Sequence, residues 1–310
     1  MNFNVVVLGG IYTDISSKVE EIPRVNEVKI STGFKTALGG KAANVSIGLS
    51  RLGINSYLIG RIGNDIRGNN NLEIIRSENV NTNYITIDHE TETGAIILMI
   101  LPDGQEAIIS NKLANYKMTI DDIDKVMTDI DKNKIKFDMA YINTELLPEI
   151  VNYSISEFSK RNIKMMVDLG PKPTVVDQSK YQLIDFLTAN QHEVAQITKM
   201  EIKNKDNAKQ ALSRLSNNGL KNIIITMGID GGAYSFHENR KIEFFDADKI
   251  NPVDSTAAGD AFRAGFIYKY LTTKNISEAI KFAKRCSSFS VQKFGGYDSL
   301  PKLKDFEKSL

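Results

Sequence analysis

"AANVSIGLSRLGINSYLIGRIG" (residues 42–63) predicts a helix that is followed at once by a strand. Val45, Leu49 and Leu52 follow one another at helical spacing, and Gly53 suits the end of a helix. The next run, 55–63, is short and apolar, as buried strands are. A helix that leads directly into a buried strand is typical of proteins in which helices and strands alternate.

The same alternation extends through most of the chain. Further strands are expected at 4–10, 137–143, 163–170, 185–190 and 221–228. Further helices are expected at 68–79 and near 119–132, 147–161, 191–200 and 206–217, with Thr119 and Asp122 as a capping pair. This order predicts an α/β fold in which helices cover both faces of a mostly parallel sheet. Because the chain has no internal repeat, low-complexity stretch or interdomain linker, we expect one domain over residues 1–310.

Three segments depart from the alternation. "GAIILMILPDGQEAIIS" (94–110) is two strand-like runs around Pro-Asp-Gly, which is a hairpin signal. "EVKISTGFKTA" (27–37) is also strand-like and has no helix beside it, and 231–245 predicts a second hairpin. Together, 27–37 and 94–110 are expected to form a small projecting sheet that serves as a lid or a dimer surface.

The composition excludes several classes of protein. The formal net charge is +1 and no basic run occurs, so nothing favours nucleic acid or an anionic membrane as a partner. A single cysteine, Cys286, rules out an intrachain disulfide, and His89, His192 and His237 lie too far apart in sequence to suggest a Cys/His metal site. The first residues lack a basic region and a long apolar run, so a cytoplasmic location is expected.

The stretch "DSTAAGD" (254–260) is the strongest candidate for chemistry. Asp260 is expected near a helix N-terminus, behind residues small enough to expose their amides to an anion. A carboxylate there is also a good helix cap, but capping does not need Ala257, Ala258 and Gly259 before it. An amide cradle beside a carboxylate suits phosphoryl transfer, in which the base accepts a hydroxyl proton and the amides hold the charge.

The stretch "ALGGKAAN" (37–44) is a second candidate. Gly39 and Gly40 precede a predicted helix whose first turn holds Lys41 and Asn44. It is not a Walker A loop, because Lys35 stands where the first glycine of that motif would be and Ala42 replaces Ser or Thr. A glycine turn with a solvated lysine and a capping asparagine explains it about as well as a ligand site.

Three weaker signals follow predicted strands. In "NQHEV" (190–194), Asn190 and Glu193 could hold a hydrated Mg²⁺, although an N-cap with a capping box is the better reading of the motif alone. The glycines of "TMGIDGG" (226–232) would permit a nucleotide to approach the backbone, or would simply form a turn. Asp14 could accept hydrogen bonds from sugar hydroxyls or cap a turn.

Taken in order, these motifs resemble those of the ribokinase-like (PfkB) carbohydrate kinases. "GGKAANVSIGLSRLG" is similar to the N-terminal signature of that family, "DSTAAGDAFRAGFI" to its C-terminal signature and "NQHE" to its N-x-x-E motif. The resemblance extends from "VVVLGG" to "GGYDSLP", and within the family the ribokinase branch fits best. It implies a three-layer α/β/α sandwich with a β-sheet lid near 13–36 and 91–111, which closes over the sugar and often forms a homodimer.

The resemblance also implies a role for each matching residue. Asp260 would be the base that acts on a primary hydroxyl, and Ala257, Ala258 and Gly259 would form the anion hole. The sugar would be held by Asp14, Gly40, Lys41, Asn44 and Glu145. Asn190 and Glu193 would organise Mg²⁺ and phosphate, and Thr226, Gly228 and Gly231 would border ATP. An activating K⁺ would lie at Asp254, Thr256, Ser290, Lys293, Gly295 and Ser299, mostly bound by backbone carbonyls.

The acceptor is the least determined part of this reading. The ribokinase branch implies conversion of D-ribose to D-ribose 5-phosphate, but that branch commonly has Asn two residues before the substrate aspartate, where this chain has Tyr12. A nucleoside, fructose, a 2-keto-3-deoxy sugar acid or a sugar phosphate are alternative acceptors for the same fold. A sugar sensor without catalysis is a further alternative, against which the presence of Asp260 and Gly259 argues.

Overall fold

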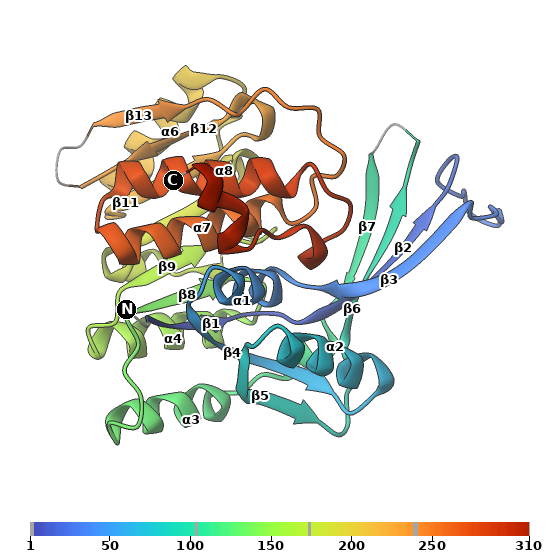
Figure 1. Ribbon diagram of the computed structural model, residues 1–310, viewed down its shortest axis with the longest axis horizontal. Coiled ribbons are helices and arrows are strands. Elements are labelled where there is room, and N and C mark those ends of the chain that lie inside the picture. The colour runs from blue at the N-terminus through green and yellow to red at the C-terminus, as the bar shows by residue number, and fades with distance from the viewer. Residues whose placement is uncertain (1–2, 103–104, 173–174, 238–240, 310) are drawn as a thin grey trace.

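The computed structural model describes residues 3–102, 105–172, 175–237 and 241–309, and it shows an α/β fold. A sheet of nine strands forms the middle layer, and helices cover both of its faces (Figure 1). A separate sheet of four strands extends from one side of this body. The predicted sandwich with a mostly parallel sheet and a second, smaller sheet is confirmed.

The large sheet has the strand order β13-β12-β11-β10-β9-β8-β1-β4-β5. All neighbours from β5 to β11 pair in parallel, whereas β12 and β13 are antiparallel. The strands are β1 (Asn4–Leu8), β4 (Asn55–Gly63), β5 (Asn81–Asp88), β8 (Met139–Asn143), β9 (Met165–Asp168), β10 (Phe186–Asn190), β11 (Asn222–Thr226), β12 (Gly232–Ser235) and β13 (Ile242–Phe245).

Two hydrophobic cores lie on the two faces of this sheet because successive side chains of a strand point to opposite sides. Val5 and Val7 of β1 pack in one core with α1 (Lys41–Arg51), α2 (Ile66–Ser77), α7 (Ala258–Thr273) and α8 (Ile276–Ser290). Val6 and Leu8 pack in the other with α3 (Ile120–Asp131), α4 (Pro148–Lys160), α5 (Gln191–Thr198) and α6 (Lys205–Asn217). Short 3-10 helices are η1 (Leu113–Lys117), η3 (Gln178–Leu183), η4 (Gly228–Asp230), η5 (Tyr297–Ser299) and η6 (Leu303–Ser309).

The small sheet, called the lid sheet below, has the order β3-β2-β6-β7 and projects to the right in Figure 1. Its strands are β2 (Tyr12–Lys18), β3 (Gly33–Gly39), β6 (Gly94–Ile100) and β7 (Glu106–Asn111). The strand expected over 27–37 is wrong in its first part, because strand pairing begins only at Gly33. In the predicted Pro-Asp-Gly turn, residues 103 and 104 lie outside the described residues.

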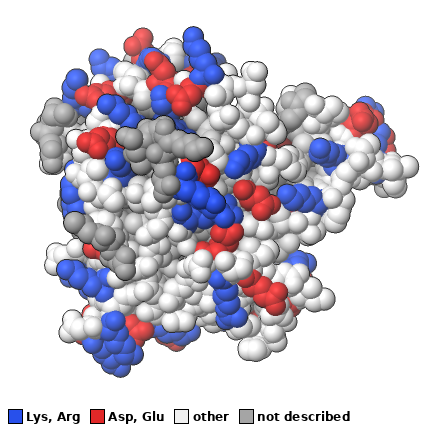
Figure 2. Space-filling view, viewed as in Figure 1, with Lys and Arg blue, Asp and Glu red and all other residues white. Residues whose placement is uncertain are grey.

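Other local expectations had mixed outcomes. Thr119 and Asp122 do form a capping box at the start of α3, and β12 pairs with β13 as a hairpin whose residues 238–240 lie outside the described ranges. Sequence patterns did not reveal β5, whose "NTNYITID" is largely polar, or α8. Positive and negative side chains are interspersed over the face shown in Figure 2, in keeping with the small net charge. Within the described residues, no helix has the length and apolar character needed to span a bilayer.

Candidate active site

The site lies at the carboxyl ends of the central strands. β1 has β4 on one side and β8 on the other, so the connections leave β1 in opposite directions at this point. Open parallel sheets bind ligands in the crevice formed where the strand order reverses in this way. β8 and β9 end there in two polar residues, Asn143 and Asp168, and neither is exposed to solvent.

Two helix N-termini meet at this crevice, and neither has a side-chain cap. α1 follows Gly40 and α7 follows Ala257, and no side chain accepts a hydrogen bond from the first amides of either helix. By contrast, side chains cap α2, α5, α6 and α8. Free amides and a positive dipole end favour anions, so α1 and α7 together provide the electrostatics of an anion site.

The two helices are joined by one buried hydrogen bond. Asn44 Nδ2 in α1 donates to Asp260 Oδ2 in α7 over 2.8 Å. Asp260 is 6% exposed, and burial raises its pKa to about 6, although Arg263, Asn44 and Lys41 oppose that rise. The carboxylate therefore does not cap α7, which was the alternative reading of its motif, and faces α1 instead.

The glycine pair before α1 is explained by close contacts rather than by a simple turn. A Cβ on Gly39 would lie 2.1 Å from Asp14 Oδ1, so only glycine leaves room for that carboxylate. Gly40 has φ +101°, and a Cβ there would lie 2.5 Å from the Gly10 carbonyl oxygen. β3 thus passes into α1 through one residue, with Asp14 of β2 held against the junction.

Asp14 lies in an acidic environment. Burial raises its pKa to about 7, with further contributions from Asp260, Glu145 and Glu106. Its Oδ1 atom is buried and has no hydrogen-bond partner among the described residues. Glu145 is paired with Lys112, whose Nζ lies 3.4 Å from Oε2. An uncharged ligand with several hydroxyl groups could supply the donors that Asp14 lacks.

Tyr12 lies beside these groups, and its side chain is fully buried. A Cβ on Gly10 or Gly94 would lie within 3 Å of the Tyr12 ring, and Lys112 Nζ lies 5.1 Å from the centre of the ring. Burial, with smaller contributions from Glu145 and Tyr116, raises the pKa of Tyr12 far above its usual range. The hydroxyl is therefore neutral, and it has no partner among the described residues.

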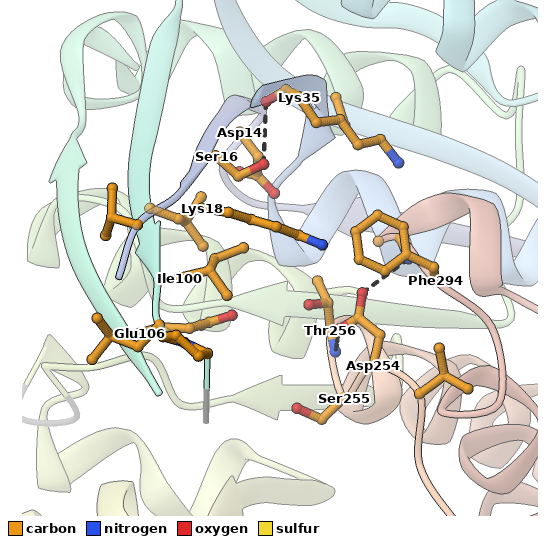
Figure 3. Close-up of a pocket in the computed structure, with 18 of the residues that line it drawn as sticks. Asp14, Ser16, Lys18, Lys35, Ile100, Glu106, Asp254, Ser255, Thr256 and Phe294 are labelled. Atoms are coloured by element: carbon orange, nitrogen blue, oxygen red, sulfur yellow. Dashed lines mark hydrogen bonds between the residues drawn. The ribbon is translucent and has the colours of Figure 1, made fainter. Parts of the chain in front are cut away.

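Two cavities flank the start of α7. The first, of about 680 Å³, lies between the lid sheet and the loops that contain Asp254 and Phe294. In Figure 3, Asp14, Lys18 and Glu106 point into it from the lid sheet, opposite Asp254 and Phe294. The second, of about 810 Å³, lies between residues 227–230, 246–250 and 287–291. Pro252 and Ser255 line both cavities, which therefore approach each other just before Ala257.

Of the residues expected near a nucleotide, Gly228 and Ala258 line the second cavity. Thr226 pairs with Asn190 where β11 and β10 end. Gly231 has φ +80°, and a Cβ there would lie 2.0 Å from the Phe245 carbonyl oxygen, so its contact with β13 already requires glycine. The cavity is also lined by Ile229, which is 88% exposed.

Asn190 and Glu193 form the capping box that the sequence favoured. Asn190 Oδ1 accepts from the amides of His192 and Glu193, and Glu193 Oε2 accepts from the Asn190 amide. The other oxygen of Glu193 lies 3.0 Å from Lys41 Nζ, so the capping residue also contacts α1. Burial alone would lower the pKa of Lys41, but Asp168 and Glu193 raise it above its usual range. Lys41 is therefore charged and paired with a carboxylate, and only a quarter of its side chain is exposed.

The six residues expected around a monovalent cation lie in two adjacent segments, 254–256 and 290–299. Asp254 joins them, because its carboxylate accepts from the Thr256 amide over 2.8 Å and from the Gly295 amide over 2.9 Å. The Ser290 and Ser299 hydroxyls lie 2.7 Å apart and pair with each other. The Lys293 ammonium lies over the ring of Phe289, at 4.0 Å from its centre.

Sequence reasoning missed three charged residues of the site. Asp168 is fully buried and pairs with Arg263, while Lys112 pairs with Glu145. Two signals were available: Asp168 closes the apolar run "MMV", and Arg263 interrupts the small and apolar side chains of "AFRAGF". Charged residues at such positions are rarely buried without a partner.

Comparison with known proteins agrees with this geometry. A family model described as pfkB family carbohydrate kinase matches residues 2–303. The chain is 27% identical to a deoxyribokinase of Salmonella typhi, with 99% of this chain and 98% of that enzyme aligned. It is 29% identical to a ribokinase of Bacillus subtilis, with 99% of each aligned. A structure of Arabidopsis thaliana ribokinase complexed with ribose and ATP superimposes with a TM-score of 0.88 at 26% identity, covering 99% of this chain and 98% of that one.

Proposed function

The chain belongs to the pfkB family of carbohydrate kinases, and from that premise we propose that it transfers the γ-phosphoryl group of ATP to the primary hydroxyl of D-ribose, giving D-ribose 5-phosphate. One observation carries the proposal: the buried Asn44–Asp260 hydrogen bond joins two uncapped helix N-termini where two cavities approach each other. An acceptor in one cavity and a donor in the other would meet near the start of α7, the helix that contains Asp260. A cytoplasmic location, where ATP is available, is part of the proposal.

Asp260 is the proposed general base. With a pKa near 6, the carboxylate is ionised at neutral pH and yet more basic than an exposed aspartate. It would accept the proton of the sugar hydroxyl as that oxygen attacks phosphorus. Asn44, which donates to one carboxylate oxygen, would hold Asp260 in one orientation.

Ala257, Ala258 and Gly259 are the proposed anion hole. Ala257 adopts φ 60°, a left-handed conformation that is uncommon for alanine and that aims the following amides. The Ala258 amide donates weakly to the Ser255 carbonyl, at 3.2 Å, and a transferring phosphoryl group would be a stronger acceptor. The charge that develops during transfer would be held at the positive end of α7.

The proposed acceptor residues are Asp14, Gly40, Lys41, Asn44 and Glu145. Asp14 and Glu145 approach the same crevice as Asp260, since Asp260 and Glu145 both raise the pKa of Asp14. The unpartnered oxygens of Asp14 and Asn44 could accept hydrogen bonds from sugar hydroxyls. The acidic character of this crevice supports a neutral sugar over a sugar acid or a sugar phosphate.

The second cavity is the proposed ATP site, bordered by Thr226, Gly228 and Gly231. The ribokinase structure that is described as complexed with ribose and ATP supports both as substrates here. No group of three or more His, Cys, Asp or Glu side chains within the described ranges is arranged to bind a metal directly. The proposed Mg²⁺ would be held through water by Asn190 and Glu193, where it would neutralise phosphate charge.

An activating K⁺ is proposed between segments 254–256 and 290–299. Asp254 holds the two segments together through backbone amides, which leaves the carbonyls of this loop pair as oxygen donors of the kind that K⁺ prefers. Of the six residues assigned by resemblance, Ser290 and Ser299 would contribute backbone oxygens, because their hydroxyls already pair. The cation would lie behind the anion hole and add positive charge there.

We propose that the lid sheet closes over the sugar and forms a homodimer. One face of it bears Asp14, Ser16 and Lys18 and lines the first cavity. By strand alternation, the other face bears Phe34, Ile97 and Ile109, which are 69%, 39% and 53% exposed. An exposed apolar sheet face of this kind is a typical surface for pairing with a second copy.

A coupled assay of ADP formation over a panel of acceptors tests the proposed function. The panel contains D-ribose, 2-deoxy-D-ribose, fructose, nucleosides, 2-keto-3-deoxy sugar acids and sugar phosphates, with and without K⁺. We expect D-ribose to give the highest kcat/KM. A higher value for another acceptor would reassign the substrate and keep the chemistry, and transfer to none of them would favour a sugar sensor.

A further inference from the structure

A buried ion pair lies directly beneath the start of α7. Arg263 follows Asp260 by one helical turn, and its side chain is only 5% exposed. Its Nη2 atom lies 2.5 Å from Asp168 Oδ1, at the end of β9. Asp168 is fully buried and also accepts hydrogen bonds from Tyr141 Oη at 2.9 Å and Asn143 Nδ2 at 3.3 Å. Asp168 is therefore held on several sides and anchors the guanidinium.

The remaining guanidinium atoms face the reacting end of α7. Nη1 lies 3.9 Å from Asp260 Oδ1, and a Cβ on Gly259 would lie 2.4 Å from the same Nη1. Nε is buried and has no hydrogen-bond partner among the described residues. Nη2 of Arg263 is thus fixed by Asp168, and Nη1 lies beside Asp260 and Gly259, the proposed base and the last residue of the proposed anion hole.

An ion pair that only tied α7 to β9 would not need this orientation. Replacing a buried ion pair by apolar residues is often neutral or stabilising, so stability alone does not explain an ion pair at this position. A Cβ at Gly259 would require Nη1 of Arg263 to move, so the start of the helix and the guanidinium lie in close contact. The guanidinium therefore limits where the Asp260 carboxylate can lie, and it also favours the ionised form of that carboxylate.

Charged groups surround Asp260 on several elements. Arg263 of α7 and Lys41 of α1 favour its ionised form, whereas Asp168 of β9 disfavours it. Asp14 of β2 and Tyr141 of β8 also interact electrostatically with Asp260. Among these groups Arg263 gives the largest opposition to the effect of burial, so its loss has a predictable direction.

We propose that Arg263 is a positioning residue for phosphoryl transfer: anchored by Asp168, it holds the Asp260 carboxylate and the first turn of α7 in the arrangement that the acceptor hydroxyl meets. The inference rests on the proposed function and adds to it a residue that touches neither substrate. It also assigns Asp168 the task of orienting the guanidinium.

Steady-state kinetics against pH test the proposal in R263Q, R263K and D168N. For R263Q we expect kcat to fall on the order of 10- to 100-fold while the KM for the acceptor changes less than about two-fold. The acid limb of kcat should move upward by about one pH unit, because a cation near Asp260 is lost. R263K should recover part of kcat, and its acid limb should lie most of the way back toward the wild-type pH.

D168N is expected to move the acid limb the other way. It removes the carboxylate that disfavours ionisation of Asp260 and leaves Arg263 free to approach Asp260, so the limb should move to lower pH. The value of kcat should still fall, because the guanidinium loses its anchor. Opposite shifts in two variants of one ion pair cannot arise from a general loss of stability.

R61Q is the matched control. Arg61 is a partly buried arginine outside the site, paired with Asp88 at 2.8 Å and Asp122 at 3.0 Å. The R61Q substitution should lower Tm and leave the acid limb of kcat unchanged. Equal acid limbs in wild type, R263Q and D168N, or a kcat within two-fold of wild type in R263Q, would overturn the inference while the proposed function stands. If R263Q does not fold, R263K and D168N decide by the same criteria, and a wild type without transfer to any acceptor overturns both.

Discussion

Asn44 Nδ2 donates to Asp260 Oδ2 over 2.8 Å, although 216 residues separate the two in the chain. The bond joins α1, which continues the lid sheet through Gly40, to α7, which borders the second cavity, the proposed ATP site. The side that would recognise the acceptor and the side that would activate it are therefore in direct contact.

Replacing Asp260 by Asn should separate activity from stability. We expect kcat to fall about 10²- to 10⁴-fold, the usual contribution of a general base. The folded-state pKa of Asp260 is about 6 against 3.8 unperturbed, so ionisation of this residue destabilises the protein as pH rises from about 4 to 6. D260N should thus be more stable at pH 8, by up to about 3 kcal/mol, with little difference at pH 4.

Kinetics and thermal unfolding of D260N at both pH values provide the measurement. Near-normal turnover would remove Asp260 from its assigned role as base. An equal loss of Tm at pH 4 and pH 8 would show that burial does not govern its ionisation.

The KM for the acceptor should depend on the ionisation of Asp14. Its pKa is raised to about 7, so the carboxylate is mostly protonated at pH 6 and mostly ionised at pH 8. Because the ionised form is the better acceptor of sugar hydroxyls, KM should fall several-fold over this range. In D14N the KM should be high and flat between pH 6 and 8, and a D14N profile that kept the wild-type slope would contradict the assignment.

Removing the Tyr12 hydroxyl should affect binding and leave folding unchanged. The hydroxyl is buried without a partner among the described residues, so Y12F breaks no hydrogen bond within the protein. If the sugar supplies that partner, the KM of Y12F for the acceptor rises several-fold while Tm stays within about 2 °C. Y12N empties the space of the ring and should cost about 2–4 kcal/mol of stability, which makes it the control for packing. An unchanged KM in Y12F would place the hydroxyl outside the acceptor site.

The outer face of the lid sheet should determine the oligomeric state. Ile97 and Ile109 are neighbours on that face, so a charge at either would be buried without a partner in a dimer. I97E and I109E should sediment as monomers, whereas wild type sediments at twice the mass of one chain. V28E is the control, because Val28 is 90% exposed and lies outside the strands. A monomeric wild type would refute the dimer.

Activity should rise when K⁺ replaces Na⁺ at fixed ionic strength. Gly295 has φ +107°, and a Cβ there would lie 3.2 Å from Lys35 Nζ, so G295A should distort the loop that Asp254 holds. We expect G295A to require more K⁺ for half-maximal activation while its KM for the acceptor changes little. Equal rates of the wild type in the two salts would count against the cation site.

Periodic features of the chain were predictable, and departures from periodicity were not. The apolar run of β1 and the spacing of Val45, Leu49 and Leu52 determine local structure directly, so these elements follow from sequence. β5 was not predicted, because five of its eight residues are Asn, Thr or Asp. It is the edge strand of the sheet and pairs with β4. Pairing with β4, and not the local propensity of its own residues, makes this segment a strand.

The site shows the same division. Asp260, Asn44 and the glycine pair could be selected as candidates because small residues beside a carboxylate or lysine stand out in the sequence. Arg263 and Asp168 were not, because they are 95 positions apart and gain meaning only when α7 packs over β9. At Glu193 the capping box was expected from the sequence, whereas its contact to Lys41, 152 positions away, was not.

The direct passage from β3 through Gly40 into α1 places the two proposed binding sites in different parts of the chain. Residues proposed to select the alcohol all come from the first 145 positions, whereas the proposed ATP cavity is built from positions beyond 190. Substitutions in the first set can therefore change which alcohol is preferred while every residue that lines the proposed ATP cavity stays the same.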